Sequence, residues 1–385
     1  MDHTVPLSLY RPLPVVESLT ERLFPATSYQ QLREHFLAAA KGCPHRHMAY
    51  VHPLRGSRGE ELAMDVVRLG HAQCHATLVI TSACHGVEGP AGSALQSDLL
   101  RHALLENLPA GVEILLIHGL NPYGFSWGRR VDEKGVDLNR NFVDFASPLP
   151  FNQDYNALAE AILPRELNPA SLQHAQAQRT AYRQQHGEIR YDHGVAAGQY
   201  SDPHGLFYGG VEPSWSRQTL EKIWQHFGLT QRVKIAVVDI HTGIGPHGYG
   251  ELICDLPPGG VGSQRAQRWY GASVTHPVLG GSASGVRYGL TDYGWLAAFG
   301  ERLSFVTLEF GTGPFDTLLQ VLQGDHWCHR QKLATNHPTM QHWRKQLEDF
   351  FNPPSASWQE MVIWRGRQVI RQTLEALADP SRPTT

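Results

Sequence analysis

Cysteine is scarce in this chain of 385 residues, and the five that occur follow no regular pattern. They are Cys43, Cys74, Cys84, Cys254 and Cys328, and no two of them stand in a Cys-x-x-Cys spacing. Disulfide-dependent secreted domains and structural zinc sites made of cysteine pairs both carry regular spacings. The sequence therefore predicts reduced thiols.

Long hydrophobic runs are missing as well. No stretch reaches the roughly 18 apolar residues that a membrane helix needs, and the first residues lack the basic and apolar segments of a signal peptide. The formal net charge is only −3, which gives no reason to expect a nucleic-acid or membrane partner. Since 41% of the residues are hydrophobic, we expect a cytoplasmic protein with a large core.

Short β-rich apolar runs alternate with helical patterns along the chain. This alternation predicts an α/β protein, with a sheet that carries helices on both of its faces. The expected strands are 66–68, 76–81, 112–118, 234–240 and 303–308, and the expected helices include 28–41, 91–107, 340–351 and 358–377.

Two helical additions are expected around this sheet. Residues 152–187 are polar, rich in alanine and glutamine and poor in β-formers, which predicts a helical insertion over about 152–228. Residues 336–385 are expected to form a helical C-terminal extension packed on the same domain. We therefore expect one catalytic domain over residues 1–335 and no independent second domain.

A histidine and a carboxylate follow the strand expected at 76–81. His85 and Glu88 stand three residues apart, and Gly86, Gly89 and Pro90 separate the strand from the next helix. In open α/β sheets, ligands collect beyond the carboxyl ends of the strands. Histidine and glutamate one turn apart can bind a single zinc ion, although His-x-x-Glu alone also fits a hydrogen-bonded turn histidine beside a solvated glutamate.

Three further segments place suitable polar residues after expected strands. The strand at 112–118 leads into Asp137-Leu-Asn139-Arg140-Asn141, His241 follows 234–240, and Glu309 follows 303–308. Two imidazoles and one carboxylate leave a tetrahedral zinc with one open position, which is typical of catalytic zinc sites. The remaining glutamate would supply a base.

In these motifs the sequence resembles the zinc metallocarboxypeptidases of carboxypeptidase A type, including cytosolic members and acylamino-acid deacylases. The likeness covers residues 75–325 and is nearest to an uncharacterised bacterial branch. It implies a mixed, mostly parallel, twisted sheet and a single zinc ion. It further implies that His85, Glu88 and His241 hold this ion, and that Glu309 acts as general base and then as acid.

The resemblance also implies contacts with the substrate. Asn139 and Arg140 would grip a carboxylate, and Arg130, nine residues before Asn139, would polarise the scissile carbonyl. For the adjacent Arg129, a surface ion pair is the better interpretation. Asp137 would hydrogen-bond the first zinc histidine and fix its ring, or else serve as a plain turn aspartate.

Some positions of the family pattern stay open. Many secreted members place a tyrosine over the substrate, and here both Tyr288 and Tyr293 are candidates. The glycine- and aromatic-rich segment 198–210 is typical of a shaped loop beside a cleft, or of a loop packed for structural reasons. The residue at the floor of the specificity pocket is not identified by the sequence.

The sequence thus predicts a zinc-dependent hydrolase that cleaves an amide or peptide bond next to a free carboxylate. The substrate would be a small peptide or an acylamino acid. Two alternatives remain, namely an N-acyl amino acid deacylase of the same fold and a non-catalytic zinc-binding relative. Retention of Glu309 argues against the second alternative, because a metal shell alone does not need this carboxylate.

Overall fold

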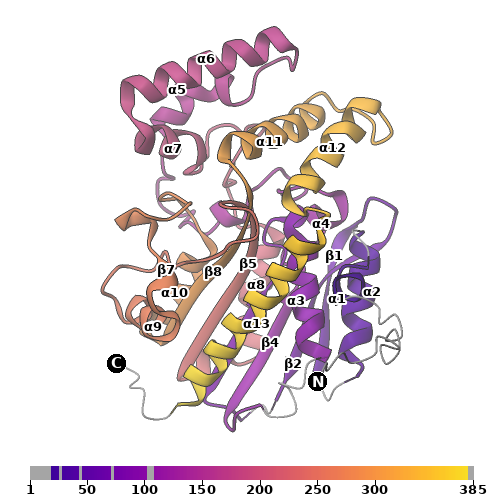
Figure 1. The fold of residues 1–385 in the computed structure, drawn as a ribbon, viewed down its shortest axis with the longest axis vertical. Helices are drawn as coiled ribbons and strands as arrows, with labels where there is room; N and C mark the ends of the chain where they lie inside the picture. Colours follow the sequence, from indigo (N-terminus) through magenta and orange to yellow (C-terminus); the bar gives the residue numbers. More distant parts are fainter. Residues whose placement is uncertain (1–18, 26–27, 43–45, 71–72, 102–107, 380–385) are drawn as a thin grey trace, which may run out of the picture.

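The protein is built around one eight-stranded sheet (Figure 1). The computed structural model describes residues 19–25, 28–42, 46–70, 73–101 and 108–379. Across the sheet the strand order is β1-β2-β4-β3-β5-β8-β6-β7. The strands are β1 (Arg46–Arg55), β2 (Glu61–Leu69), β3 (Ala76–Thr81), β4 (Val112–His118), β5 (Lys234–Ile244), β6 (Gly250–Ile253), β7 (Val274–Thr275) and β8 (Leu303–Gly313).

The centre of the sheet is parallel. Strands β4, β3, β5 and β8 run side by side in one direction, whereas β1 is antiparallel to β2, β2 to β4 and β6 to β8. Every residue of β3 and β4 is buried, as expected for strands covered on both faces. The prediction of a mixed, mostly parallel α/β sheet is confirmed.

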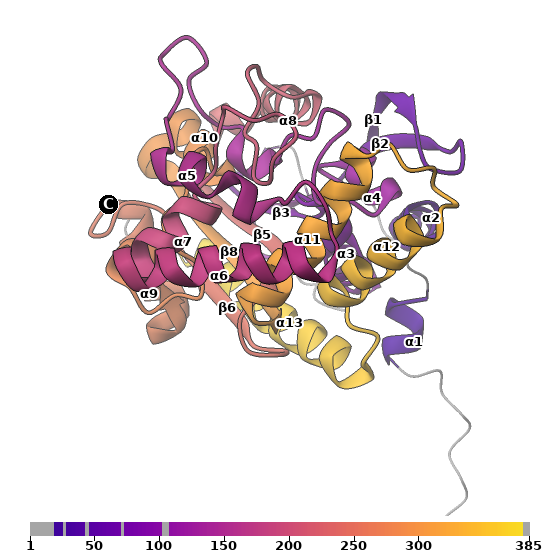
Figure 2. The ribbon, with the colours of Figure 1, turned by 90° about the horizontal axis from the view of Figure 1, so that it is seen from above.

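Helices cover both faces of this sheet. Helices α3 (Gly89–Arg101) and α13 (Ala356–Ala378) lie on one side, and α8 (Trp215–His226) and α10 (Thr291–Phe299) on the other (Figure 2). The second layer is held by large aromatics, since Trp224 of α8 packs on Trp295 of α10 with ring centroids 4.7 Å apart. The other helices of the sheet layers are α1 (Leu19–Leu23), α2 (Tyr29–Ala40), α4 (Pro122–Trp127), α9 (Val261–Tyr270), α11 (Phe315–Arg330) and α12 (Pro338–Phe351).

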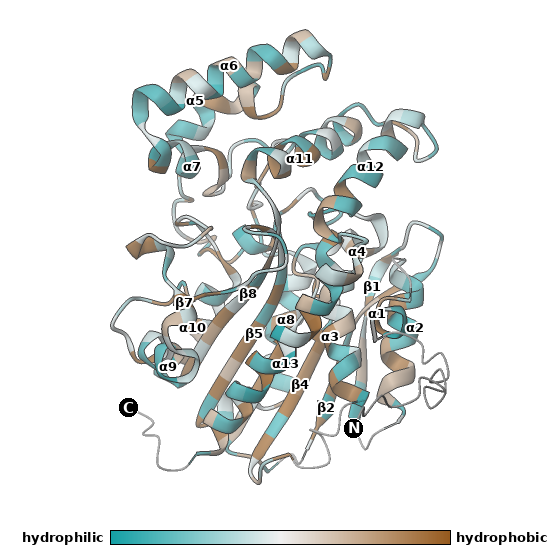
Figure 3. Ribbon diagram, viewed as in Figure 1, coloured by the Kyte–Doolittle hydropathy of each residue, from teal (hydrophilic) through white to brown (hydrophobic). Residues whose placement is uncertain are grey.

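Three helices of the expected insertion lie beyond the carboxyl ends of the parallel strands (Figure 1). They are α5 (Gln153–Ile162), α6 (Pro169–His186) and α7 (Glu188–Ala196). The last helix within the expected range 152–228 is α8, which covers the sheet instead. The side chains of Asn152 and Asn168 cap α5 and α6 by accepting backbone N–H groups, which is a preferred use of asparagine. Only Ala175 of α6 is buried, and Figure 3 shows a largely hydrophilic helix.

Several elements differ from the sequence-based expectation. Strands β5 and β8 pair as far as Ile244 and Gly313, so His241 and Glu309 lie within strands and not after them. The edge strand β1 was missed because most of its residues are exposed, and β6 and β7 because they are very short. Short or exposed strands carry a weak hydrophobic pattern.

Some expectations reach beyond the described residues. The four described cysteines, Cys74, Cys84, Cys254 and Cys328, form no disulfide, whereas Cys43 lies outside the described residues. The end of the helix expected at 91–107 also lies outside them. None of the described helices is both long enough and apolar enough to cross a membrane.

The two C-terminal helices hold the strands that carry His241 and Glu309. Trp358 of α13 is fully buried, and its Nε1 donates a hydrogen bond of 3.0 Å to the Gly311 carbonyl of β8. Next to His241, the Thr242 hydroxyl donates to the Phe351 carbonyl at the end of α12, at 2.6 Å. These bonds fix the carboxyl ends of β5 and β8.

We expect Trp358→Ala to lower the free energy of unfolding by about 3–5 kcal/mol, because it leaves a large cavity and removes one of the two hydrogen bonds to the Gly311 carbonyl. Trp364→Ala on the same helix is the control, since Trp364 is 60% exposed, and should cost less than about 1 kcal/mol. Denaturant unfolding followed by circular dichroism measures both variants. Equal losses would show that Trp358 does not anchor α13.

Candidate active site

The turn after β3 is shaped by close backbone packing. Ala83 adopts a positive φ of 57°, and the chain then enters a short 3₁₀ turn, Gly86–Glu88. A Cβ on Gly86 would lie 2.0 Å from the Gly124 carbonyl carbon, and one on Gly89 would lie 2.5 Å from the Phe125 ring. Both glycines are therefore needed where the turn meets α4.

His85, Glu88 and His241 converge on one point. The Nδ1 atoms of the two histidines face each other at 3.2 Å. Glu88 Oε1 lies 2.8 Å from Nδ1 of His85, and Oε2 lies 3.0 Å from Nδ1 of His241. All three side chains are buried, and one candidate ligand atom from each lies within 4.8 Å of the others.

The outer nitrogen of each histidine is held by an aspartate. His85 Nε2 lies 3.1 Å from Asp137 Oδ1, and His241 Nε2 lies 2.9 Å from Asp239 Oδ2. Such contacts leave Nδ1 as the nitrogen available to a metal and fix the ring orientation. The expected contact of Asp137 is present in the structure.

The sequence analysis did not assign a function to Asp239. A signal for it exists, because Asp239 and His241 stand two residues apart in a strand and their side chains therefore share one face. The Thr81 hydroxyl also donates to Asp239, at 2.6 Å. Asp239 thus positions His241 as Asp137 positions His85.

This donor set fits a divalent metal ion such as zinc. Two nitrogens bound to one tetrahedral zinc lie about 3.3 Å apart, close to the 3.2 Å between the two Nδ1 atoms. The surroundings also favour positive charge. Burial opposes the charged form of each group. The two histidines nevertheless hold the pKa of Glu88 well below its usual value. Asp239 and Glu88 likewise hold the pKa of His241 well above the usual value for histidine.

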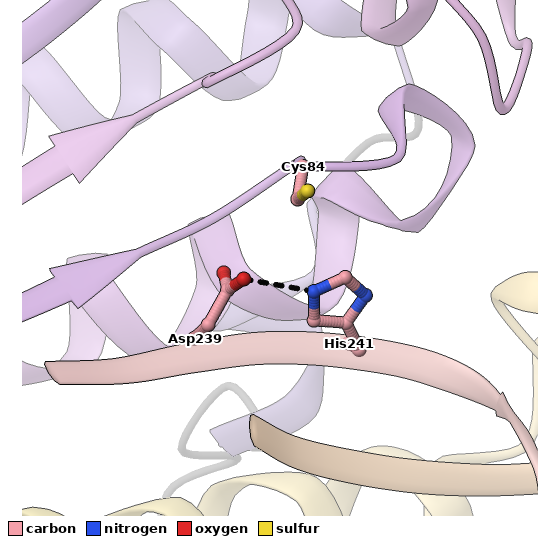
Figure 4. A group of neighbouring side chains, drawn as sticks. All are labelled: Cys84, Asp239 and His241. Atoms are coloured by element: carbon pink, nitrogen blue, oxygen red, sulfur yellow. Dashed lines mark hydrogen bonds and ion pairs between the residues drawn. The ribbon is translucent and has the colours of Figure 1, made fainter. Parts of the chain in front are cut away.

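Cys84 belongs to a different group of candidate ligands. Its sulfur lies near Asp239 and the outer side of the His241 ring (Figure 4), and these three residues also have ligand atoms within 4.8 Å of one another. In this group Asp239 contacts His241 Nε2, which is the nitrogen facing away from Glu88. Burial raises the pKa of the Cys84 thiol to about 12, which disfavours a thiolate ligand.

Arg130 is fixed beside the candidate metal ligands. Its Nε donates to Asp137 Oδ2 at 2.9 Å, and its Nη1 lies 3.4 Å from Glu88 Oε1. Although burial alone would lower it, the nearby charges of Asp137 and Glu88 raise the pKa of Arg130. Arg130 is therefore a permanent positive charge at the wall of the site.

For Arg129, the expectation of a surface ion pair is wrong in one respect. Arg129 forms an ion pair, with Nη2 2.9 Å from Asp325 Oδ2, but both residues are buried. Its partner lies on α11, almost 200 positions away in the sequence, so no local pattern could show it. This ion pair holds the segment that contains Arg129 and Arg130 against α11.

Glu309 lies next to His241 in the sheet. The two residues are register partners on the parallel strands β5 and β8, so their side chains project from the same face. Burial, together with the negative charge of Glu88, raises the pKa of Glu309 to about 8. A carboxyl group with such a pKa can both accept and donate a proton near neutral pH.

A cavity of about 90 Å³ connects these groups with Asn139 and Arg140. Arg140 donates from Nη1 to the Asn139 carbonyl at 2.6 Å and from Nη2 to the Ala196 carbonyl at 2.8 Å. Its buried Nε has no hydrogen-bond partner among the described residues. Asn139 accepts from the Thr291 amide at 2.8 Å. A larger hollow, of about 780 Å³, lies between α2 and α12 and holds none of the predicted site residues.

The loop over residues 198–210 lies beside this cavity, and Phe207 forms part of its wall. The guanidinium groups of Arg130 and Arg140 lie 5.4 and 5.7 Å from the Phe207 ring centroid. Neither Tyr288 nor Tyr293 lines the cavity. The Tyr293 hydroxyl donates to the Arg287 carbonyl at 3.3 Å, and the Tyr288 ring packs on His193. A substrate contact by either tyrosine stays a prediction.

A protein-family profile described as "Protein of unknown function (DUF2817)" matches residues 24–365. The chain belongs to the DUF2817 family. No curated protein matches this DUF2817 chain.

Solved structures resemble the DUF2817 protein at low sequence identity. Thrombin activatable fibrinolysis inhibitor is 11% identical over 73% of this chain and 67% of its own, with a TM-score of 0.43. A metallo-carboxypeptidase from Pseudomonas aeruginosa is 13% identical over 87% and 68%, with a TM-score of 0.37. Succinylglutamate desuccinylase from Chromobacterium violaceum is 14% identical over 83% and 74%, with a TM-score of 0.35.

The names of these structures include a metallo-carboxypeptidase and a desuccinylase.

We expect one zinc ion per chain of the DUF2817 protein, and its loss in His85→Ala and His241→Ala. Removing an outer-shell partner costs about 10–100-fold in metal affinity, and removing a ligand should cost more. Metal analysis of the dialysed proteins measures this. His247→Ala is the control, because His247 is exposed. If either ligand variant kept stoichiometric zinc, the assigned site would be wrong.

Proposed function

We propose that this protein is a zinc-dependent hydrolase that cleaves an amide or peptide bond next to a free carboxylate. One observation carries the proposal. The paired Nδ1 atoms of His85 and His241 lie in the same cavity as Glu309 and Arg140. A metal site, a base and a carboxylate receptor are thereby available to one small substrate.

His85, Glu88 and His241 would hold the zinc ion. When bound, zinc lowers the pKa of a water molecule and polarises a substrate carbonyl. Asp137 and Asp239 keep the two imidazoles in the tautomer that leaves Nδ1 free. The Thr242 amide donates to Glu88 Oε2 at 3.1 Å and orients the carboxylate.

Glu309 is the proposed general base and acid. It lies beside His241 on the neighbouring strand, and its pKa, raised by burial and by Glu88 to about 8, suits proton transfer near neutral pH. Glu309 would take a proton from the attacking water and deliver it to the leaving nitrogen. A metal shell alone would not need this carboxylate.

Arg130 would stabilise the negative charge that develops on the carbonyl oxygen. Its guanidinium group is held by Asp137 through Nε, so little reorganisation is needed during the reaction. A fixed positive charge acts more strongly in such a buried site than in bulk water.

Arg140 and Asn139 would bind the substrate carboxylate. The buried Nε–H of Arg140 has no hydrogen-bond partner in the described part of the chain, and a carboxylate oxygen is a strong partner for such a donor. Burial lowers the pKa of Arg140 to about 10, which still leaves the guanidinium charged at neutral pH. A bound carboxylate would offset the cost of burying this charge.

The size of the cavity favours a small group at this end of the substrate, such as a single amino-acid residue. The volume is about 90 Å³, and one wall comes from Ala196 at the end of α7. An N-acyl amino acid or a short peptide is the substrate class that we propose.

In Glu309→Gln, we expect zinc content to stay at the wild-type level and turnover of an N-acyl amino acid to fall by about 10²–10⁴-fold, the usual contribution of general acid–base catalysis. Glu360→Gln, at an exposed position of α13, should change neither quantity. Metal analysis and a ninhydrin assay of the released amine test both variants. Loss of zinc in Glu309→Gln would show that Glu309 is a ligand.

Blocking the substrate carboxylate tests the role of Arg140. We expect kcat/KM for a C-terminally amidated substrate to be about 10–100-fold lower than for the free acid. This factor corresponds to the free energy that a hydrogen bond to a charged group contributes. In Arg140→Lys, the preference for the free acid should shrink, because lysine lacks the planar fork. Equal hydrolysis of both substrates by the wild-type protein would refute the carboxylate receptor.

A further inference from the structure

The backbone of Phe207 is strained. Three described residues other than glycine adopt a positive φ, namely Ala83, Phe207 and Lys332, and Phe207 is the aromatic one, with a φ of 55°. A bulky residue in this region is a genuine outlier. Such strain persists where the surrounding structure enforces it, and it gathers at functional sites. Phe207 also lines the cavity, so the strain lies where a substrate would bind.

Gln199 enforces this conformation from inside the same loop. It is only 1% exposed. Its backbone amide donates to the Phe207 carbonyl at 3.1 Å, and its Nε2 donates to the Leu206 carbonyl at 3.3 Å. Its Oε1 accepts the backbone amides of Ser201 and Asp202, at 2.9 and 2.7 Å. One buried residue thus holds the carbonyls on both sides of the Phe207 φ torsion.

The ring that this backbone holds faces two positive charges. The guanidinium carbons of Arg130 and Arg140 lie 5.4 and 5.7 Å from the Phe207 ring centroid. Burial lowers the pKa of Arg140, Asp137 opposes this shift, and the positive charge of Arg130 adds to it, because the two guanidinium groups repel each other. The face of an aromatic ring attracts cations within about 6 Å. Phe207 therefore offsets the repulsion between two like charges.

The same loop also fixes the backbone of both arginine segments. The Tyr200 hydroxyl donates to the Arg140 carbonyl at 2.6 Å. The Tyr208 carbonyl accepts the Asp137 amide at 2.8 Å, and Asp137 in turn accepts from Arg130 Nε at 2.9 Å. The loop thus contacts Arg140 directly and reaches Arg130 through Asp137.

We propose that Phe207 is a positioning residue, whose ring fixes the spacing of Arg130 and Arg140 so that one substrate meets both charges. This inference rests on the proposed function, in which Arg130 faces the scissile carbonyl and Arg140 the substrate carboxylate. The strained backbone directs the ring at both guanidinium groups. Their spacing then selects substrates by the separation between the reacting carbonyl and the carboxylate.

Dicarboxylates of increasing length measure this spacing without turnover. The probes are malonate, succinate, glutarate and adipate, titrated calorimetrically into the full-length, zinc-loaded protein. Two linked groups bind most tightly when the length of the link matches the span between their sites. We expect the wild-type protein to bind one length at least about tenfold more tightly than the others, which corresponds to one hydrogen bond between charged groups.

Phe207→Leu keeps an apolar side chain but lacks the ring face. It should reduce the length preference to less than about threefold, because the attraction that holds both guanidinium groups is lost. Phe207→Tyr keeps the ring and should keep the preference. The control is Phe299→Leu, which should also keep it, since Phe299 is 2% exposed, faces Arg302 at 5.8 Å and does not line the cavity.

Phe207→Gly is the second test, because glycine removes the ring and also relieves the backbone strain. It should lose the length preference as Phe207→Leu does, so the test does not depend on the folding of the leucine variant. The inference is overturned if the wild-type protein binds none of the four probes or binds them all alike. It is also overturned if the variants without the ring keep the wild-type preference, even when their affinity for all four probes is lower, since Phe207 would then only pack the cavity wall.

Hydrolysis of N-acyl amino acids tests the proposed function separately. If these substrates are cleaved but the length preference does not depend on Phe207, the proposed function stands and the positioning role is rejected. If the preference depends on Phe207 and no amide is cleaved, the proposed function fails and the positioning role of the ring stands.

Discussion

The Asp137 carboxylate is the contact on which the rest of the site depends. Its Oδ1 contacts His85 Nε2 and accepts the Asn139 amide, while its Oδ2 accepts from Arg130. One buried anion thus sets the orientation of the candidate ligand His85, of the Arg130 guanidinium and of the turn that carries Asn139 and Arg140. Burial would raise its pKa, yet Arg130 and His85 hold that pKa well below the usual value, so the carboxylate stays ionised.

Much of the sheet was predictable because its central strands are buried on both faces. Such strands read as continuous apolar runs, and β3 and β4 were predicted to the residue. The same regularity predicted the candidate ligands, since parallel strands bring His85, His241 and Glu309 to one edge of the sheet. The edge strands lack this pattern, because part of each edge strand is exposed to solvent.

Other parts of the site depend on contacts between distant segments. The buried partner of Arg129 lies on α11, and the cavity joins residues from β6, α7 and α10. No local pattern specifies which of these segments meet. For this reason the full lining of the cavity could not be identified from the sequence, although the candidate metal ligands could. Asp239 could have been identified from the sequence, because it stands two residues before His241.

The anchoring of β5 and β8 by the C-terminal helices has a consequence for biosynthesis. The strand that carries His241 is bonded to Phe351, and the strand that carries Glu309 is bonded through Gly311 to Trp358. A ribosome-bound chain that has not yet released these residues lacks both contacts. A metal ion held by the candidate ligands would therefore bind with full affinity only after these helices are in place, and a truncated translation product would carry every proposed ligand without the framework that aligns them.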